Sequence, residues 1–179
     1  MPEGLFRPQL GEPHHYAYVV EDIEATVNAL ADQLGAGPFF LIEGVPLENV
    51  LSRGEPAEFV HNSAFGSCGA GAIELIEPLS LAPERVEKRF SGPRPGIHHV
   101  GYAVPPTEVA DLRSSLDERG LPQYLSSQLG EVDSTLHDAS AAAAEGRVVD
   151  ELRRLTAREN VFQRHVLDEE ERSGAELVD

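Results

Sequence analysis

A short phrase that begins with two histidines occurs twice in the chain, and the two copies start 84 residues apart. The first copy is HHYAYVV at residues 14–20, and the second is HHVGYAV at residues 98–104. Each copy is followed by a run with helical spacing of apolar residues, and the runs end at Gly35 and Gly120. The repetition predicts a duplicated unit whose halves pack together by pseudo-symmetry. Because histidines that converge on one point usually surround a metal ion, a metal site between the halves is expected.

The first half has the pattern of a β-α-β-β-β unit. Branched and aromatic residues predict a strand at 15–20, and Asp22 is suited to cap a helix that ends at Gly35. Three more strands are expected, with a loop after the first of them and a glycine-rich turn before the last. Their ranges are 39–43, 57–65 and 72–77. Residues 13–79 therefore form the predicted first module.

The second half repeats this opening after a linker at 80–96. A strand at 98–104 is followed by a helix that ends at Gly120. Two further strands are expected at 124–127 and 132–137. The predicted second module covers residues 97–138.

The end of the chain departs from the repeat. Where the first module has its last strand, residues 139–144 are almost all alanine, and a charged run with helical spacing of apolar residues follows. The second module is therefore expected to lack its last strand. Residues 139–172 are expected to form a C-terminal helical segment instead.

Charge and composition exclude several classes of function. A formal net charge of −17 repels nucleic-acid phosphates and anionic lipid surfaces, so neither is an expected partner. One cysteine, Cys68, permits no internal disulfide, which fits a reducing cytoplasm. The sequence has no apolar stretch of the length that a membrane span needs and no signal-peptide pattern at its start. A cytoplasmic, soluble protein is expected.

The order of these phrases resembles the vicinal oxygen chelate superfamily, which includes glyoxalase I, methylmalonyl-CoA epimerase, extradiol dioxygenases and bleomycin-resistance proteins. The phrases at 14–22 and 96–102 are similar to the opening strands of its two modules, and IELIEPL at 73–79 is similar to a closing strand. GAGPFF at 35–40 resembles glyoxalase-like members. The resemblance implies an α+β fold of tandem βαβββ modules in a cup-like mixed sheet, here with the last strand of the second module missing and a C-terminal helix added.

The resemblance also implies a set of metal ligands on the first and last strand of each module. It places His15 and Glu74 of the first module in the site, together with His99 of the second. The family's fourth ligand belongs to the missing strand, and Glu145 is the nearest acid. Two imidazoles and a carboxylate suit a divalent Zn, Fe, Ni, Co or Mn ion and leave positions open for a substrate.

The histidines outside this set are expected to have other roles. Strand neighbours alternate between faces, so His14 and His98 are predicted to point away from the metal. His61 and His137 are expected to be ordinary polar residues of strands.

The implied function is that of a metal-dependent lyase or isomerase, in the manner of glyoxalases and epimerases. It would act on a small carbonyl or acyl-thioester compound through a metal-stabilised enediolate, with Glu58 as the base. Two alternatives stay open. One is an extradiol-type Fe(II) dioxygenase, since two histidines and a carboxylate also bind iron(II). The other is a metal-free ligand-binding or resistance protein. A small-molecule substrate is the expected partner, and a homodimer is left open.

Overall fold

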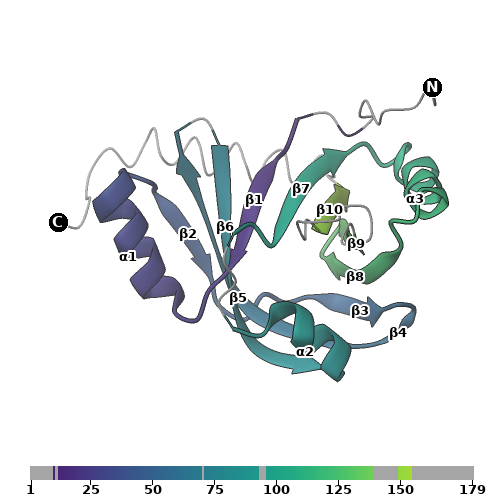
Figure 1. Cartoon of the computed structure of the whole chain (residues 1–179), viewed down its shortest axis with the longest axis horizontal. Coiled ribbons are helices and arrows are strands. Elements are labelled where there is room, and N and C mark those ends of the chain that lie inside the picture. Colours follow the sequence, from purple (N-terminus) through teal and green to yellow (C-terminus); the bar gives the residue numbers. More distant parts are fainter. Residues whose placement is uncertain (1–9, 11, 70, 93–95, 139–148, 155–179) are drawn as a thin grey trace.

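The computed structural model describes the chain except for residues 1–9, 11, 70, 93–95, 139–148 and 155–179. In the described part, ten strands form one sheet in the order β2-β5-β6-β1-β7-β10-β9-β8-β3-β4, and three helices accompany it. Both parallel and antiparallel pairs occur in this sheet. The sheet is strongly curved, as Figure 1 shows. The predicted α+β class with a mixed sheet is confirmed.

The first module follows the predicted β-α-β-β-β order. Its elements are β1 (His15–Val19), α1 (Ile23–Leu34), β2 (Phe39–Ile42), β5 (Glu58–Cys68) and β6 (Gly71–Ala82). Asp22 caps α1 by accepting a hydrogen bond from the amide of Ala25 at 2.8 Å, and the helix ends at Gly35 with a positive φ of 63°.

The loop between β2 and β5 contains a short hairpin that the sequence did not suggest. Its strands are β3 (Glu48–Ser52) and β4 (Glu55–Pro56). β3 pairs with β8 of the second half, so this segment extends the far side of the sheet.

The second module repeats the same order after the linker helix α2 (Glu84–Phe90). Its elements are β7 (His99–Val104), α3 (Val109–Glu118), β8 (Gln123–Leu129), β9 (Val132–Asp138) and β10 (Val149–Arg154). β10 lies between β7 and β9, parallel to the first and antiparallel to the second. This is the arrangement of β6 between β1 and β5 in the first module.

The expected absence of a last strand in the second module is therefore wrong, and so is the expected helix over the residues of β10. Without β10, the facing edges of β7 and β9 would carry unpaired backbone groups, and pairing them outweighs a weak helical pattern in the sequence. The remainder of the predicted segment 139–172 lies outside the described residues.

The two modules meet where β1 and β7 pair in antiparallel fashion at the centre of the sheet (Figure 1). His15 lies opposite Gly101, and Ala17 lies opposite His99. An offset of 84 positions relates the two pairs: His15 corresponds to His99, and Ala17 corresponds to Gly101. The register therefore has a local two-fold axis that passes between Tyr16 and Val100.

Helices and apolar side chains cover this sheet in three clusters. Ile23 of α1 packs against Ala64 and Leu75, and Leu112 and Leu116 of α3 pack against Val104. A third cluster joins both modules and the linker helix: Ala17, Val19, Phe59, Ile76, Val86, Phe90, Tyr124, Leu125 and Leu136. No helix in the described part is long and apolar enough to cross a membrane.

Candidate metal centre

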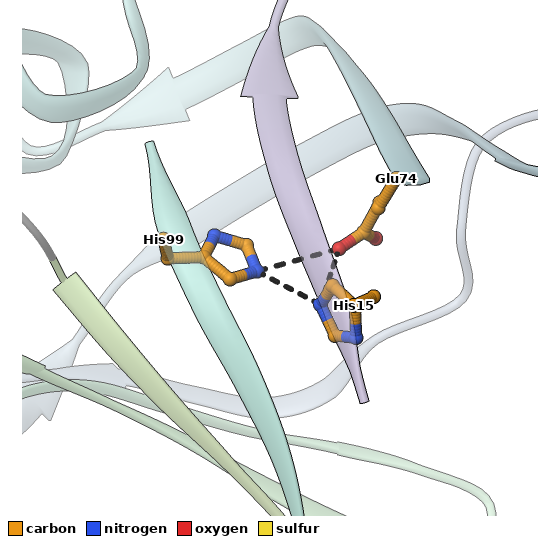
Figure 2. A group of neighbouring side chains, drawn as sticks. All are labelled: His15, Glu74 and His99. Atoms are coloured by element: carbon orange, nitrogen blue, oxygen red, sulfur yellow. Dashed lines mark hydrogen bonds and ion pairs between the residues drawn. The ribbon is translucent and has the colours of Figure 1, made fainter. Parts of the chain in front are cut away.

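Three buried side chains converge beside the two-fold axis, from β1, β6 and β7 (Figure 2). Nε2 of His15 lies 3.1 Å from Oε2 of Glu74, and Nε2 of His99 lies 3.4 Å from the same oxygen. The two Nε2 atoms are 3.2 Å apart. His15, Glu74 and His99 are 0%, 4% and 2% exposed. The structure thus brings together the three ligand candidates on which the sequence converged.

The backbone register explains why these side chains meet. Antiparallel pairing of β1 and β7 places both histidines on the same face, two positions apart across the pair. Glu74 is the register partner of Ala17 on the other side of β1, so its carboxylate reaches the same face. Gly101 is required here, because a Cβ at this position would lie 2.0 Å from Cε1 of His15.

The donor set and its spacing fit a divalent cation. Donor atoms around a tetrahedral ion with bonds of about 2.0–2.1 Å are about 3.3 Å apart, close to the separations between the three atoms here. Imidazole nitrogen with carboxylate oxygen suits Zn, Fe, Ni, Co or Mn. A buried carboxylate is also costly without a compensating charge. The residues present therefore fit the metal that the resemblance implies.

Ser63 of β5 holds the far oxygen of the carboxylate. Its hydroxyl donates a hydrogen bond of 2.9 Å to Oε1 of Glu74. This leaves Oε2 for the two imidazoles and restricts rotation of the carboxylate plane. Ser63 is 1% exposed, so the hydrogen bond is shielded from water.

A cavity of about 50 Å³ opens beside the cluster, and Glu74 and His99 form part of its wall. Most of the wall is apolar, with hydroxyl groups from both modules. It is lined by Ile42, Val45, Leu47, Phe59, His61, Ser63, Phe65, Glu74, Ile76, Phe90, His99, Leu125, Ser126, Ser127, Leu129, Val132, Ser134 and Leu136. Such a pocket suits a small, partly apolar molecule that reaches the metal centre with a polar group.

The structure does not bring Glu58 to this cavity. Phe59 and His61 of β5 line the cavity, and alternation along the strand directs Glu58 to the opposite face. Glu58 is exposed there and accepts a hydrogen bond from the hydroxyl of Ser80. His61, expected to be an ordinary strand residue, is buried in the cavity wall and stacks on Phe59 with ring centroids 4.2 Å apart.

The other expected ligand, Glu145, lies outside the described residues. The register of β10 points to a different acid. Glu151 is the register partner of Gly101, as Glu74 is the register partner of Ala17. Since Gly101 and Ala17 are equivalent under the two-fold axis, Glu151 occupies the backbone position that corresponds to Glu74. The sequence contained one signal for this residue. The number of positions between His99 and Glu151 is similar to the number between His15 and Glu74.

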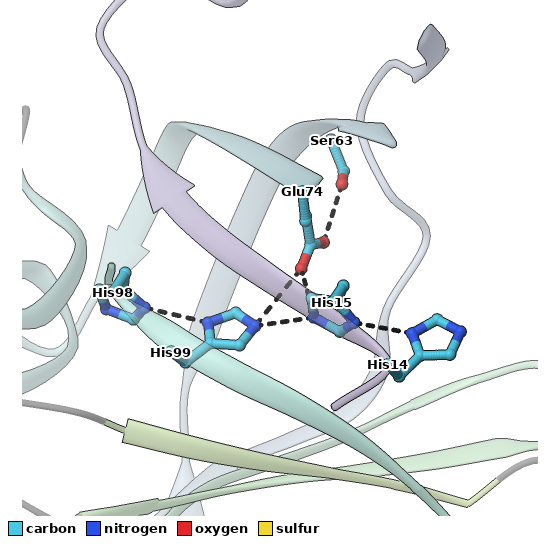
Figure 3. Close-up of polar contacts among 6 residues, drawn as sticks. All are labelled: His14, His15, Ser63, Glu74, His98 and His99. Atoms are coloured by element: carbon cyan, nitrogen blue, oxygen red, sulfur yellow. Dashed lines mark hydrogen bonds and ion pairs between the residues drawn. The ribbon is translucent and has the colours of Figure 1, made fainter. Parts of the chain in front are cut away.

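The prediction that His14 and His98 point away from the cluster is wrong. Nδ1 of His14 lies 2.9 Å from Nδ1 of His15, and Nδ1 of His98 lies 3.1 Å from Nδ1 of His99 (Figure 3). Both residues precede the first residue of a strand, where the alternation of strand faces does not yet apply. Each outer ring therefore lies beside its inner neighbour.

A tandem-module α+β protein with a buried His-Glu-His cluster at the module interface is the class that this fold and site define. The sequence model of the glyoxalase/bleomycin resistance protein/dioxygenase superfamily matches residues 14–128, and the chain belongs to this superfamily.

Solved structures agree on the fold. Methylmalonyl-CoA epimerase from Mycobacterium tuberculosis is similar with a TM-score of 0.54 and 16% identity, over 89% of this chain and 97% of that one. Hypothetical protein BH1468 from Bacillus halodurans C-125 is similar with a TM-score of 0.52 and 20% identity, over 81% and 94%. A selenomethionine methylmalonyl-CoA epimerase has a TM-score of 0.51 and 15% identity, over 80% and 94%. No curated protein matches the sequence.

Proposed function

We propose that the protein is a metal-dependent lyase or isomerase that acts on a small carbonyl or acyl-thioester compound. The observation that carries the proposal is the convergence of His15 Nε2, Glu74 Oε2 and His99 Nε2 within 3.1–3.4 Å in a buried site beside a cavity. The fold shared with two methylmalonyl-CoA epimerases supports the acyl-thioester class. A cytoplasmic location and a small-molecule substrate belong to the same proposal.

His15, Glu74 and His99 would hold the metal, and we assign Glu151 as the fourth ligand from its register position. When bound, a divalent cation supplies Lewis acidity to a carbonyl oxygen and stabilises the negative charge that develops when the adjacent C–H loses its proton. Ser63 keeps the Glu74 carboxylate oriented through its hydrogen bond to Oε1.

The cavity residues would bind the rest of the substrate. The apolar wall that includes Phe59 and Phe90 would exclude water from the reacting carbon. His61 lies four residues along β5 from Phe65, the register partner of Glu74, which is about 13 Å along a strand. That separation suits a contact with the far end of a metal-bound substrate. Glu58 faces away from the cavity, and we assign it no proton transfer.

Hydrogen exchange at the substrate carbon tests this function. Metal-free protein loaded in turn with Zn, Mn, Co, Ni or Fe would be incubated in D₂O with a panel of acyl-CoA thioesters and hemithioacetals. Deuterium at the carbon next to the carbonyl, detected by NMR, is the expected result. His99→Ala should lose bound metal and exchange together. Elemental analysis that still finds one metal per chain in that variant would refute the metal assignment.

The iron(II) dioxygenase alternative has one supporting observation, because two histidines and one carboxylate also form the iron-binding triad of oxygenases. A fourth protein ligand at Glu151 favours the lyase or isomerase, since it leaves fewer positions for oxygen and substrate. Oxygen consumption with catechol by the iron-loaded protein would decide for the dioxygenase. A chain that binds no metal, with a melting temperature unchanged by chelator, would instead be a metal-free binding protein.

A further inference from the structure

Four imidazoles stand in a row across the module interface, in the order His98, His99, His15 and His14 (Figure 3). The inner pair meets Glu74 through Nε2 atoms. Each inner ring meets its outer neighbour through the Nδ1 atoms of both rings, at 2.9 Å in the first module and 3.1 Å in the second. The same contact therefore occurs on both sides of the two-fold axis.

The backbone holds both outer histidines in equivalent places. The amide of His14 donates to the carbonyl of Gly101 at 2.7 Å, and the amide of His98 donates to the carbonyl of Ala17 at 2.7 Å. Each acceptor is also the register partner of the adjacent inner histidine, Gly101 for His15 and Ala17 for His99, so the outer and inner histidines lie opposite the same residue at each end. The outer rings are thus set by the same symmetric register as the inner ones.

A backbone carbonyl fixes which nitrogen of His98 carries the proton. Nε2 of His98 lies 3.1 Å from the carbonyl oxygen of Arg89, and a carbonyl oxygen only accepts hydrogen bonds. In the neutral ring the proton is therefore on Nε2, and Nδ1 presents a lone pair. His98 is 5% exposed and packs against Phe90 with ring centroids 4.6 Å apart, so the ring is firmly held.

The position of the proton on His98 then determines which nitrogen of His99 carries a proton. Because Nδ1 of His98 is an acceptor, Nδ1 of His99 must be the donor of the hydrogen bond between them. A neutral imidazole with its proton on Nδ1 has its lone pair on Nε2. That lone pair points at Glu74 and His15, which is the direction in which a metal ligand must present it.

The linker helix anchors this chain of hydrogen bonds. Arg89 of α2 forms an ion pair with Asp138 of β9, and its guanidinium lies 5.1 Å from the ring centroid of Tyr124. Arg85, one turn earlier, donates to the hydroxyl and the carbonyl oxygen of Ser52 at 3.0 and 2.9 Å. The carbonyl that orients His98 is therefore held in place by contacts with the second half of the sheet.

We propose that His14 and His98 are positioning residues that accept the Nδ1–H of His15 and His99 and so fix Nε2 of each inner ring as a metal ligand. The inference rests on the proposed metal site. It gives each of the paired histidines in the repeated phrase a distinct role, one as ligand and one as hydrogen-bond acceptor. Outer partners of this kind raise metal affinity about 10- to 100-fold.

Cobalt(II) titration of the full-length metal-free protein, followed by the visible absorption of the bound ion, tests the proposal. His98→Phe keeps an aromatic ring against Phe90 but removes the acceptor, whereas His98→Asn places an amide oxygen near the former Nδ1. We expect His98→Phe to lower cobalt affinity about 10- to 100-fold. His98→Asn should recover most of that loss. His14→Phe and His14→Asn make the same comparison at a half-buried position.

A spectroscopic readout accompanies the titration. In the zinc-loaded protein, NMR should show the Nδ1–H proton of His99, and this resonance should shift upfield in His98→Phe and return in His98→Asn. Equal cobalt affinities for the Phe and Asn variants at either position would overturn the assignment for that histidine. His99→Ala tests the metal site separately from the role of the outer histidines. If this variant binds cobalt like the parent protein, the proposed metal site is refuted.

Discussion

Nε2 of His15 and Nε2 of His99 lie 3.2 Å apart although 84 positions separate the two residues in the chain. The approach follows from the pairing of β1 with β7, which places each histidine opposite a small residue of the other strand. Together with a carboxylate oxygen of Glu74, these nitrogens form a group of three possible ligand atoms within 4.8 Å of one another. The geometry of these three donor atoms fits a divalent cation.

Replacement of Glu151 by Gln should weaken zinc binding at least about 100-fold, because a lost ligand costs more than a lost outer partner. Glu151 is the register counterpart of Glu74 across the two-fold axis. Competition with a chromophoric chelator measures the affinity. Glu145→Gln is the matched control and should bind zinc within about 3-fold of the parent protein, well inside the range of an outer partner. The reverse outcome would mean that the fourth ligand is Glu145.

Gly101→Ala should damage the metal centre through His15. The added Cβ would lie 2.0 Å from Cε1 and 2.5 Å from Nδ1 of the His15 ring, so the ring has to move. We expect a loss of about 1–3 kcal/mol in the free energy of unfolding. Zinc affinity should fall about 10-fold or more. Gly71→Ala is the control, since its Cβ would have no contact closer than 3.8 Å. Both variants are compared by chemical denaturation and zinc titration.

Ser63→Ala should lower zinc affinity about 10-fold without preventing folding, because it frees Oε1 of Glu74 from its 2.9 Å hydrogen bond. Isothermal titration of zinc into the metal-free variant measures the change. Ser80→Ala also removes a hydrogen bond from a serine to a glutamate on this pair of strands, but that glutamate is the exposed Glu58. Unchanged affinity in Ser63→Ala, or an equal loss in Ser80→Ala, would contradict the role given to Ser63.

The repeated phrase was sufficient to predict that His15 and His99 meet, because a duplicated strand carries its register with it. Glu74 was predicted from the resemblance of residues 73–79 to a closing strand. Local pattern was insufficient for β10, whose residues VDELRR have no clear alternation and become a strand by pairing with β7 and β9. Glu151 was missed for the same reason, since only the register identifies it.

The directions of the Glu58, His14 and His98 side chains also could not be predicted from the sequence. The burial of Phe59 and His61 shows which face of the strand points inward, and Glu58 is on the other face. The sequence around Glu58 does not indicate which face is buried. His14 and His98 precede their strands by one residue, so the alternation rule assigned them to the wrong side. Both errors come from features that depend on where a strand begins and what packs against it.

Histidine 137 should make the free energy of unfolding depend on pH. His137 is buried, and this burial lowers its pKa below the ordinary value of 6.5, although the hydrogen bond from Nδ1 to the carbonyl of Leu121 partly opposes the shift. Between the folded and the unfolded pKa, the unfolded chain binds more protons than the folded one. Stability is therefore full above pH 6.5 and declines as the pH falls below it toward the folded pKa.

The substitution His137→Asn isolates this contribution, because the amide of asparagine still donates to Leu121 but does not titrate. Urea denaturation of the metal-free proteins at pH 7.5 and at pH 5.5 measures it. The parent should lose more stability between these values than the variant, by up to about 1.4 kcal/mol for each unit of pKa difference. Parallel losses in the two proteins would show that His137 takes up a proton as readily in the folded chain as in the unfolded one.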